Sequence, residues 1–328
     1  MKLTRRQTLG SICGLAAAAS MTHTIAYAAR RKKTTMRPLG IQLYMLDKDL
    51  ERDFQGTLNQ VAAMGYREVE LAGFHNRTGA ELRKAFDEAG LICASAHIQM
   101  AAMFPGMPSL AEPAKIIDIM QELGAKQVVV PAFNLPPRFA QKLTDPELMH
   151  DLRKLGAAAW QFGLEMTPDD WKDFAQTLNE KGSLLAKSGL HIGYHNHNVE
   201  LATLAGGGTP LEVLIRETDP ALVSFELDVG WAASAGIDPA AFLRRYAGRI
   251  NQLHLKDVSE RTPAGKLDFK SVDIGTGIVD WPDLMKAIAS AKIEHVYVEQ
   301  EEPFKEPPLD AARVAFNFLS KQPGLMRR

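Results

Sequence analysis

The 328-residue chain is poor in cysteine, has almost no net charge and contains no long apolar run. Its two cysteines, Cys13 and Cys93, are too few for a scaffold held together by disulfides. A net charge of −1 argues against a nucleic acid-binding groove, which needs a basic face. The apolar stretch from Ile12 to Met21 is too short to cross a bilayer. We therefore expect neither a nucleic acid partner nor a stable membrane anchor.

The first 28 residues have the pattern of an export signal. The segment Thr4-Arg5-Arg6-Gln7-Thr8-Leu9 places two arginines before the apolar stretch, and Ala26-Tyr27-Ala28 forms a small-x-small cleavage site. This order predicts a twin-arginine-type signal peptide over residues 1–28. We expect the twin-arginine export machinery as a partner and a periplasmic or otherwise exported mature protein.

The remaining part, residues 29–328, has a suitable length for a single β/α barrel. Removal of the signal takes away Lys2, Arg5 and Arg6, so the net charge of −1 becomes about −4. Cys93 is then the only cysteine, which excludes an internal disulfide. An apolar content of 46% is enough to fill an ordinary buried core.

Short apolar or β-branched runs alternate with helical patterns along this part of the chain. Trp281, Leu284 and Ile288 follow the i, i+3, i+7 spacing of an amphipathic helix. Gly65 and Gly90 each end a helical pattern and lead into the next apolar run, as C-terminal glycines do. The runs expected to be strands are 40–46, 68–71, 92–97, 127–131, 191–197, 223–229, 251–258 and 296–300.

Eight strands alternating with helices predict an α/β fold with one parallel sheet, closed into a single-domain (β/α)8 TIM barrel. An open doubly wound sheet is the structural alternative. No glycine-rich phosphate-binding fingerprint follows the first strand, which argues against that alternative.

Alternation within the strands turns a set of polar residues toward the barrel axis. Leu253 and Leu255 alternate with His254, so the imidazole is expected inside when the leucines pack against helices. The same parity points further residues inward: Glu70, His195, His197, Glu226, Asp228, Lys256, Tyr297, Glu299 and Glu301. Burying so many ionisable groups without a cation or a polar substrate costs on the order of several kcal/mol each.

Five segments make the chain resemble the xylose isomerase-like TIM barrel family, often described as sugar phosphate isomerases and epimerases. They are Tyr194-His195-Asn196-His197-Asn198-Val199-Glu200, Asp228-Val229-Gly230-Trp231, Leu253-His254-Leu255-Lys256-Asp257, Asp273-Ile274-Gly275-Thr276-Gly277 and Val298-Glu299-Gln300-Glu301. The resemblance covers essentially the whole mature chain. It implies one divalent metal held by a carboxylate after strand five together with Asp228, His254 and Glu299.

The strand-five ligand stays open between two residues. Many relatives have a glutamate within strand five, where this chain has Tyr194 and His195. Glu200, three residues past His197, can replace that glutamate, and His195 is the alternative because it faces the axis. The expected metal ligands are therefore Glu200, Asp228, His254 and Glu299. Carboxylates with an imidazole suit Mn²⁺, Mg²⁺, Co²⁺ or Zn²⁺ and single out none of them.

Two further roles are expected in the site: proton transfer during catalysis and binding of the substrate. The expected catalytic residues are Glu200, Glu299 and Lys256. The expected substrate contacts are Glu70, His97, His195, His197, Trp231 and Asp257. Plainer interpretations exist: Asp228 as a turn residue, His254 as a core histidine and Lys256 with Asp257 as a local ion pair.

The resemblance implies a sugar isomerase or epimerase that acts through an enediolate-type intermediate. A lyase or dehydratase, or an enzyme that cleaves an oxidised glycoside, would use the same metal site. A non-catalytic sugar-binding barrel is a further alternative, and a metal-dependent phosphodiesterase is disfavoured by the acidic mature chain. A small sugar is the expected partner, and an oligomer is compatible with the sequence.

Overall fold

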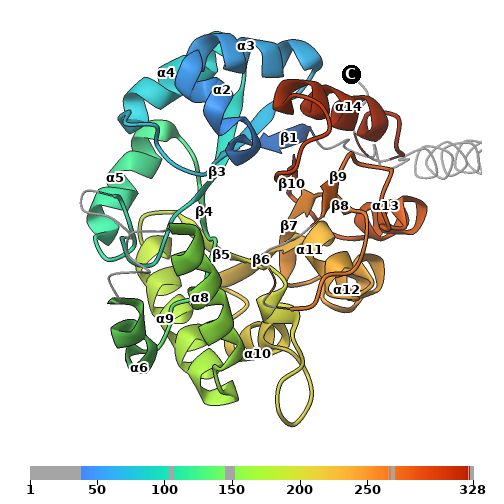
Figure 1. Ribbon diagram of the computed structural model, residues 1–328. Helices are drawn as coiled ribbons and strands as arrows, with labels where there is room; N and C mark the ends of the chain where they lie inside the picture. The colour runs from blue at the N-terminus through green and yellow to red at the C-terminus, as the bar shows by residue number, and fades with distance from the viewer. Residues whose placement is uncertain are drawn as a thin grey trace, which may run out of the picture. The chain divides into compact units, whose positions relative to one another are not determined.

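The computed structural model describes residues 38–102, 107–144, 152–264, 266, 270–323 and 325. The expected signal peptide at residues 1–28 lies outside these residues. Eight parallel strands close into a barrel in the spatial order β1-β10-β7-β6-β5-β4-β3-β2, with helices around the outside (Figure 1). The predicted (β/α)8 barrel is thereby confirmed.

The barrel strands are short, and each begins within one residue of its expected start. They are β1 (Leu39–Gln42), β2 (Glu68–Leu71), β3 (Ile92–His97), β4 (Gln127–Val130), β5 (His191–His195), β6 (Val223–Asp228), β7 (Ile250–Leu255) and β10 (His295–Val298). Six expected strands end early, two of them by three residues or more. β1 passes into a 3-10 helix, η1 (Leu43–Leu46), and β8 (Asp257–Val258) leaves the barrel to pair antiparallel with β9 (Ser271–Val272).

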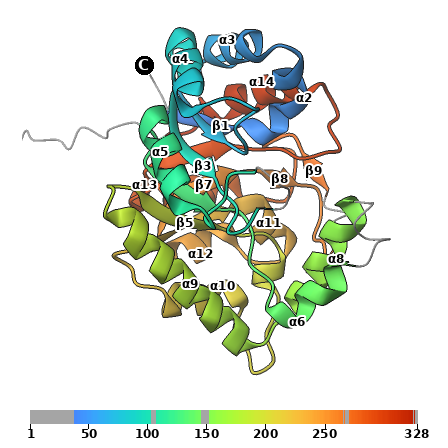
Figure 2. The same cartoon turned by 90° about the vertical axis from the view of Figure 1, so that its left-hand side faces the viewer.

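Helices follow the strands in nearly every repeat. Those of the first half are α2 (Asp47–Arg52), α3 (Phe54–Met64), α4 (Gly79–Ala89), α5 (Pro113–Leu123), α6 (Pro137–Ala140), η2 (Gln141–Thr144), α8 (Leu152–Leu164) and α9 (Pro168–Ala186). Those of the second half are η3 (Val199–Leu201), α10 (Pro210–Glu217), α11 (Val229–Ser234), α12 (Pro239–Arg245), α13 (Trp281–Ser290) and α14 (Pro308–Leu319). Figure 2 shows α3, α4 and α14 on one side of the strands and α9 and α10 on the opposite side.

Local sequence signals explain the helix ends. Thr78, Thr167 and Thr209 each accept a hydrogen bond from the backbone three residues later and complete a capping box. Gly65 and Gly90 end α3 and α4 with φ of 116° and 73°, a conformation that glycine adopts without steric cost. The two predicted glycine stops are therefore confirmed.

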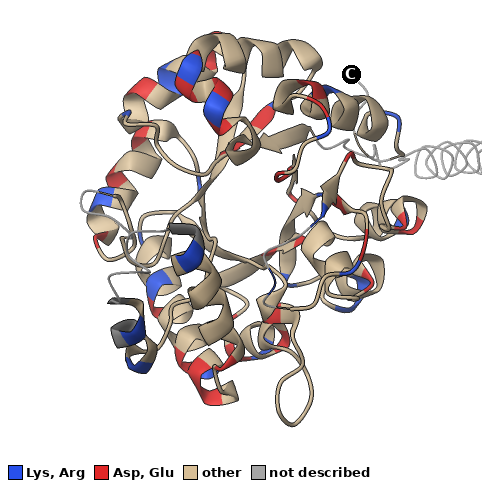
Figure 3. Ribbon diagram, in the orientation of Figure 1, with Lys and Arg blue, Asp and Glu red and all other residues tan. Residues whose placement is uncertain are grey.

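The core lies between the strands and the helices. Leu227, Leu253 and Val298 belong to it and are buried completely or almost completely. Most charged residues lie on the outer helices and their loops (Figure 3). Among the described residues, no helix combines the length and the apolar character needed to span a membrane. Many of the buried ionisable residues lie inside the barrel, and these form the candidate site.

Candidate active site

An inner cluster of carboxylates and imidazoles crosses the barrel; we define it as Glu70, His97, His195 and Glu226. Glu226 Oε2 accepts hydrogen bonds from His97 Nε2 at 3.0 Å and His195 Nδ1 at 2.9 Å. Its Oε1 accepts one from Gln252 Nε2 at 2.9 Å. Glu70 Oε2 lies 3.1 Å from His97 Nε2. The strands thus bring together residues from β2, β3, β5 and β6.

Charges within the inner cluster offset the penalty of burial. Burial opposes ionisation of Glu226, but the neighbouring imidazoles outweigh it and hold the pKa of Glu226 well below its usual range. Burial also opposes the charge of His97, yet Glu70 and Glu226 raise the pKa of His97 to about 9. His195 differs because burial and the charge of His254 lower its pKa. The inner cluster is therefore a network of ion pairs that stabilise one another.

A second group of charged residues lies nearer the C-terminal ends of the strands, where Asp228 follows Glu226 by two residues. We call it the mouth cluster and define it as Asp228, Lys256, Glu299 and Glu301. The fully buried Lys256 Nζ lies 2.9 Å from Asp228 Oδ2, 2.7 Å from Glu299 Oε2 and 2.5 Å from Glu301 Oε1. Burial opposes the charge of Lys256, but the carboxylates raise its pKa well above the ordinary value. Three carboxyl groups thus face one ammonium, and the His254 imidazole lies beside two of them, so the cluster offers oxygen and nitrogen ligands of the kind that a divalent cation uses.

His254 connects the two clusters through opposite ring nitrogens. Its Nε2 lies 2.7 Å from Glu70 Oε2 and 3.1 Å from Glu226 Oε2 in the inner cluster. Its Nδ1 lies 3.0 Å from Glu299 Oε2 and 3.9 Å from Asp228 Oδ2 in the mouth cluster. Carboxylates on one nitrogen are the usual way to orient a histidine whose other nitrogen binds a metal.

Two groups of described side chains have the proximity needed to hold a metal ion. Asp228, His254 and Glu299 form one, with ligand atoms within 4.8 Å of one another. His97, His195, Glu226 and His254 form the other. The first group has a donor set that fits a divalent ion, two carboxylates and one imidazole. In the second group, the imidazole nitrogens already face the Glu226 carboxylate.

Asp228 shows how the local fold leaves a ligand atom available. Its Oδ1 accepts a hydrogen bond from Trp231 N at 2.8 Å and caps helix α11. Its Oδ2 faces Lys256 and His254. The turn interpretation is confirmed for Oδ1, and Oδ2 faces the other predicted site residues.

Neither strand-five candidate joins Asp228, His254 and Glu299 within the part of the chain that the structure describes. Glu200 accepts hydrogen bonds from Tyr194 Oη at 2.5 Å and from His197 N at 3.1 Å. Burial raises the pKa of Glu200 to about 7. His195 lies in the inner cluster. The structure brings together three of the four predicted ligands and leaves Glu200 away from them.

Asp257 is also separate from the clusters. Its carboxylate accepts hydrogen bonds from Gly275 N, Gly277 N and Trp281 Nε1 at 2.9, 3.0 and 2.8 Å. It thereby ties the 273–281 loop to β8. Because these donors already use its oxygens, we do not assign Asp257 to the substrate.

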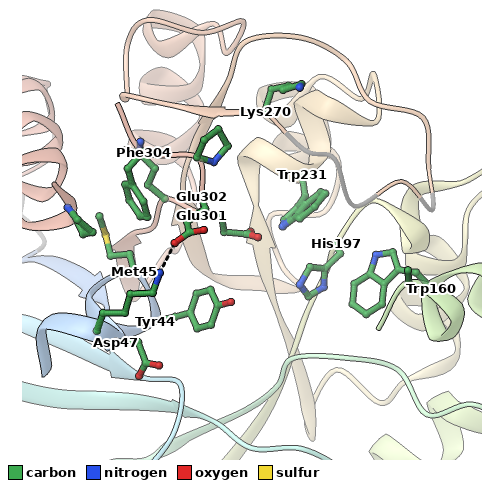
Figure 4. A pocket seen from close by; sticks show the side chains of 15 residues that line it. Tyr44, Met45, Asp47, Trp160, His197, Trp231, Lys270, Glu301, Glu302 and Phe304 are labelled. Carbon is green, nitrogen blue, oxygen red and sulfur yellow. Dashed lines mark hydrogen bonds and ion pairs between the residues drawn. The ribbon is translucent and has the colours of Figure 1, made fainter. Parts of the chain in front are cut away.

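Two cavities open at the C-terminal ends of the strands. An inner cavity of about 680 Å³ is lined by His97, His195, His197 and Glu299, among others. An outer cavity of about 840 Å³ is lined by His197, Trp231 and Glu301, among others, and Figure 4 shows these three residues around it. The expected substrate contacts His97, His195, His197 and Trp231 therefore line one or both cavities, whereas Glu70 lies beneath them with no exposed surface.

Sequence reasoning did not select Glu226, Trp160 or Phe304 as site residues. Glu226 was placed on the inner face by strand parity, and its position between three imidazoles was the missing information. Trp160 and Phe304 lie outside the strands and line the outer cavity. A single tryptophan in a helix and a phenylalanine in a loop carry no periodic signal that could have identified them.

Comparisons with known proteins agree with this geometry. The sequence profile described as "Xylose isomerase-like TIM barrel" matches residues 58–322. An inosose dehydratase of Bacillus anthracis is 26% identical over 84% of this chain and 91% of its own length.

Two solved structures share the fold. A sugar phosphate isomerase/epimerase of Parabacteroides distasonis has a TM-score of 0.68 and 24% identity, over 90% of this chain and 97% of its own. An IOLI protein with a bound zinc atom has a TM-score of 0.61 and 14% identity, over 86% of this chain and 96% of its own. At these identities the likeness to both structures shows the barrel alone.

Proposed function

The chain belongs to the xylose isomerase-like TIM barrel family, and we propose that it is a divalent-metal-dependent enzyme that moves a proton at the carbon beside the carbonyl of a sugar or sugar derivative. The observation that carries this proposal is the convergence of Asp228, His254 and Glu299 beside the buried Lys256. The relatives named isomerase/epimerase and dehydratase support the same class of chemistry.

Asp228, His254 and Glu299 are the residues that would hold the ion. Three protein ligands leave coordination positions open, which is typical of catalytic rather than structural metal sites. When bound there, a divalent ion would polarise the carbonyl of the substrate and acidify the neighbouring C–H. Mn²⁺, Mg²⁺, Co²⁺ and Zn²⁺ all suit these donors, and the zinc-bound IOLI protein supports a metal in this kind of barrel.

We assign the transfer of the substrate proton to Glu299, with Lys256 and Glu301 of the mouth cluster in supporting roles. Glu299 lines the inner cavity and is kept ionised, because Lys256 and His254 outweigh the effect of burial and hold its pKa well below the usual range. It is therefore ready to accept a proton. Lys256 positions the carboxylates of Asp228, Glu299 and Glu301 by donating to them. Glu200 is not assigned a catalytic role, because its carboxylate faces Tyr194 and His197 N.

The final product depends on where the proton goes next. Return to the neighbouring carbon gives an isomerase, and return to the opposite face gives an epimerase. Elimination of water is the second candidate, supported by the inosose dehydratases among the relatives. It needs a proton donor for the leaving oxygen, and Glu301 fits this role because burial raises its pKa beside Lys256.

The test is deuterium incorporation in D₂O, which isomerases, epimerases and dehydratases all share. Metal-loaded protein is incubated with keto-hexoses, keto-pentoses and inosose, and deuterium at the carbon beside the carbonyl is measured by NMR. Glu299→Gln should lower the exchange rate by roughly 10²–10⁴-fold, the usual effect of removing a general base. Glu200→Gln is the matched control and should retain exchange. Metal-loaded protein that binds one of these sugars without exchange or product would favour a sugar-binding barrel.

We also propose that the mature protein is exported, on the basis of Arg5-Arg6 and Ala26-Tyr27-Ala28. The N-terminal peptide of the exported protein should begin near Ala29. Replacing both Arg5 and Arg6 by lysine should retain the protein in the cytoplasm. Exported protein that still carries Met1 would contradict the cleavage site.

A further inference from the structure

The inner and outer cavities lie next to each other. Tyr44, Trp160, His197 and Glu301 line both of them. Their volumes are about 680 and 840 Å³, and pockets of roughly 300–1,000 Å³ hold drug-sized ligands. Each cavity alone can therefore take one sugar ring, and the pair is larger than a free monosaccharide requires.

An aromatic wall runs along the outer cavity; we define it as Trp160, His197 and Trp231. The ring centroids of Trp160 and His197 are 5.0 Å apart, and those of His197 and Trp231 are 5.4 Å apart. Phe304 and Tyr44 lie on the other side of the cavity (Figure 4). Aromatic faces of this kind pack against flat, partly apolar rings.

Polar atoms without a partner accompany the aromatic rings. Trp160 Nε1, His197 Nδ1 and Gln300 Nε2 are buried and have no hydrogen-bond partner within the described part of the chain. All three residues line the outer cavity. Unpartnered buried polar atoms need an explanation. Because these atoms have almost no accessible surface, the hydroxyl groups of a bound ring would supply partners for them once the neighbouring side chains shift.

The outer cavity adjoins the mouth cluster. Lys256 Nζ lies 5.4 Å from the ring centroid of Trp231 and 2.7 Å from Glu299 Oε2. A sugar that reacts beside Glu299 therefore has its neighbouring substituent directed along the aromatic wall. The charges at the rim disfavour a phosphate, since Asp47, Glu301 and Glu302 line the outer cavity with Lys48 and Lys270, and Lys48 is paired with Glu302 at 2.6 Å.

We propose that the outer cavity is a second subsite, and that the substrate is a glycoside of an oxidised sugar. The ring ketone of this sugar supplies the carbonyl that the proposed function requires and lies in the inner cavity, while the second six-membered ring lies along the aromatic wall. The unoxidised glucosides used below serve as unreactive binding analogues. This inference rests on the proposed function for the reacting ring. The second ring can be another sugar or an aryl group, because both offer a flat face to the aromatic side chains.

The test compares ligands that differ by one ring. Methyl β-glucoside, cellobiose and phenyl β-glucoside, with the corresponding galactosides, are titrated into metal-loaded protein by calorimetry. At least one two-ring ligand should bind tenfold or more tightly than its methyl counterpart. Cellobiose and phenyl glucoside distinguish a sugar ring from an aryl ring. If no two-ring ligand binds more tightly than its one-ring counterpart, the proposal is overturned.

Variants of the outer cavity locate the effect. Phe304→Ala and Trp160→Ala should each remove most of the advantage of the second ring, about fivefold or more, and Phe304→Ala should change methyl glycoside affinity less than twofold. Phe162→Ala, on the same helix as Trp160 but stacked on Phe139, is the matched control and should retain the advantage. Equal weakening of one-ring and two-ring ligands by Phe304→Ala would contradict the proposal.

The two proposals can fail separately. Deuterium exchange on a free sugar with no preference for two rings would retain the proposed function and overturn the subsite. A clear preference for two rings without exchange of any carbon-bound proton would retain the subsite and overturn the proposed function.

Discussion

The inner and mouth clusters are connected by His254, but they differ in how their carboxyl groups are paired. In the inner cluster, both oxygens of Glu226 have hydrogen-bond partners from the protein, and imidazoles balance the carboxylates. In the mouth cluster, three carboxylates face the single ammonium of Lys256, and Glu299 and Glu301 border a cavity. The same residue types thus serve different purposes: the inner cluster is balanced and fixes geometry, whereas the mouth cluster needs a ligand.

The largest difference between the clusters is expected in metal affinity. Asp228→Asn removes a ligand charge from the mouth cluster, while Glu70→Gln removes one of the two inner carboxylates that face His254 Nε2. Loss of such an outer partner costs roughly 10–100-fold in affinity, and Asp228→Asn should cost more. Titration with Mn²⁺, Co²⁺ and Zn²⁺, with elemental analysis of the purified protein, measures both. Equal losses in the two variants would contradict the division into an inner and a mouth cluster.

A large loss of folding stability is expected when a carboxylate of the inner cluster is neutralised. Glu226→Gln leaves the imidazoles of His97, His195 and His254 around a neutral amide, and removing one partner of a buried ion-pair network costs about 3–5 kcal/mol. Urea unfolding of metal-free protein should show this loss. Glu302→Gln is the control, because Glu302 pairs with Lys48 on the surface and its side chain is 65% exposed. A Glu226→Gln variant as stable as that control would show that the inner cluster does not hold the barrel together.

Strand parity predicted most of the two clusters from the sequence. It placed Glu70, Glu226 and His254 on the axis, and the structure has them within hydrogen-bonding distance of one another. Parity is informative here because the strands are regular, and because an apolar face toward the helices alternates with a polar face toward the barrel axis. It states which side a residue faces, but it does not say which residues from different strands meet.

Parity failed to describe the residues beyond the strand ends. Glu200 follows β5 through a loop and turns back to Tyr194 on the outer face, a path that depends on the loop and η3. Asp257 leaves the barrel with β8 and binds the backbone of the 273–281 loop. These positions depend on tertiary contacts of loops, which a pattern of apolar and polar residues does not contain.

Glu200 and Glu226 are both buried carboxyl groups, but Glu200 lies outside the two clusters and Glu226 lies within the inner cluster. Their pKa values can therefore be compared. Burial raises the pKa of Glu200 to about 7, above the value of about 4.3 expected in the unfolded chain. Between these values the folded state holds a proton that the unfolded state has lost, so this contribution to stability falls as the pH rises from about 4.5 to 7.

Glu200→Gln should remove that dependence. The free energy of unfolding of the variant relative to the original protein should rise by roughly 2–3 kcal/mol across this pH range, because most of the difference between the two pKa values is titrated there, at 1.36 kcal/mol for each pH unit. Urea unfolding of both proteins at several pH values from 4.5 to 8 measures the difference, in which the titration of shared histidines cancels. A difference that does not change with pH would show that Glu200 is ionised throughout.

The smallest effect tests how tightly the mouth cluster is packed. Gly230 lies in the first turn of α11, and a Cβ added there would come within 2.7 Å of Lys256 Cγ and 2.9 Å of its Cδ. Alanine favours a helix over glycine by about 1 kcal/mol, but overpacking a buried site costs roughly 1–3 kcal/mol. Since Lys256 is fully buried and held by three carboxylates, it has little room to move, and Gly230→Ala should be destabilising by about 1 kcal/mol.

Two further variants separate the clash from the helix propensity. Gly156 lies within α8, where an added Cβ meets nothing within 4 Å, so Gly156→Ala should be neutral or stabilising. In a Lys256→Ala background the Cγ and Cδ atoms are gone and only the Cβ at 2.9 Å remains. Gly230→Ala should then be less harmful than in the original protein, a coupling of about 0.5–1 kcal/mol in a double-mutant cycle. Additive losses would mean that Lys256 moves aside at no cost, and that the ammonium is not fixed between Asp228 and Glu299.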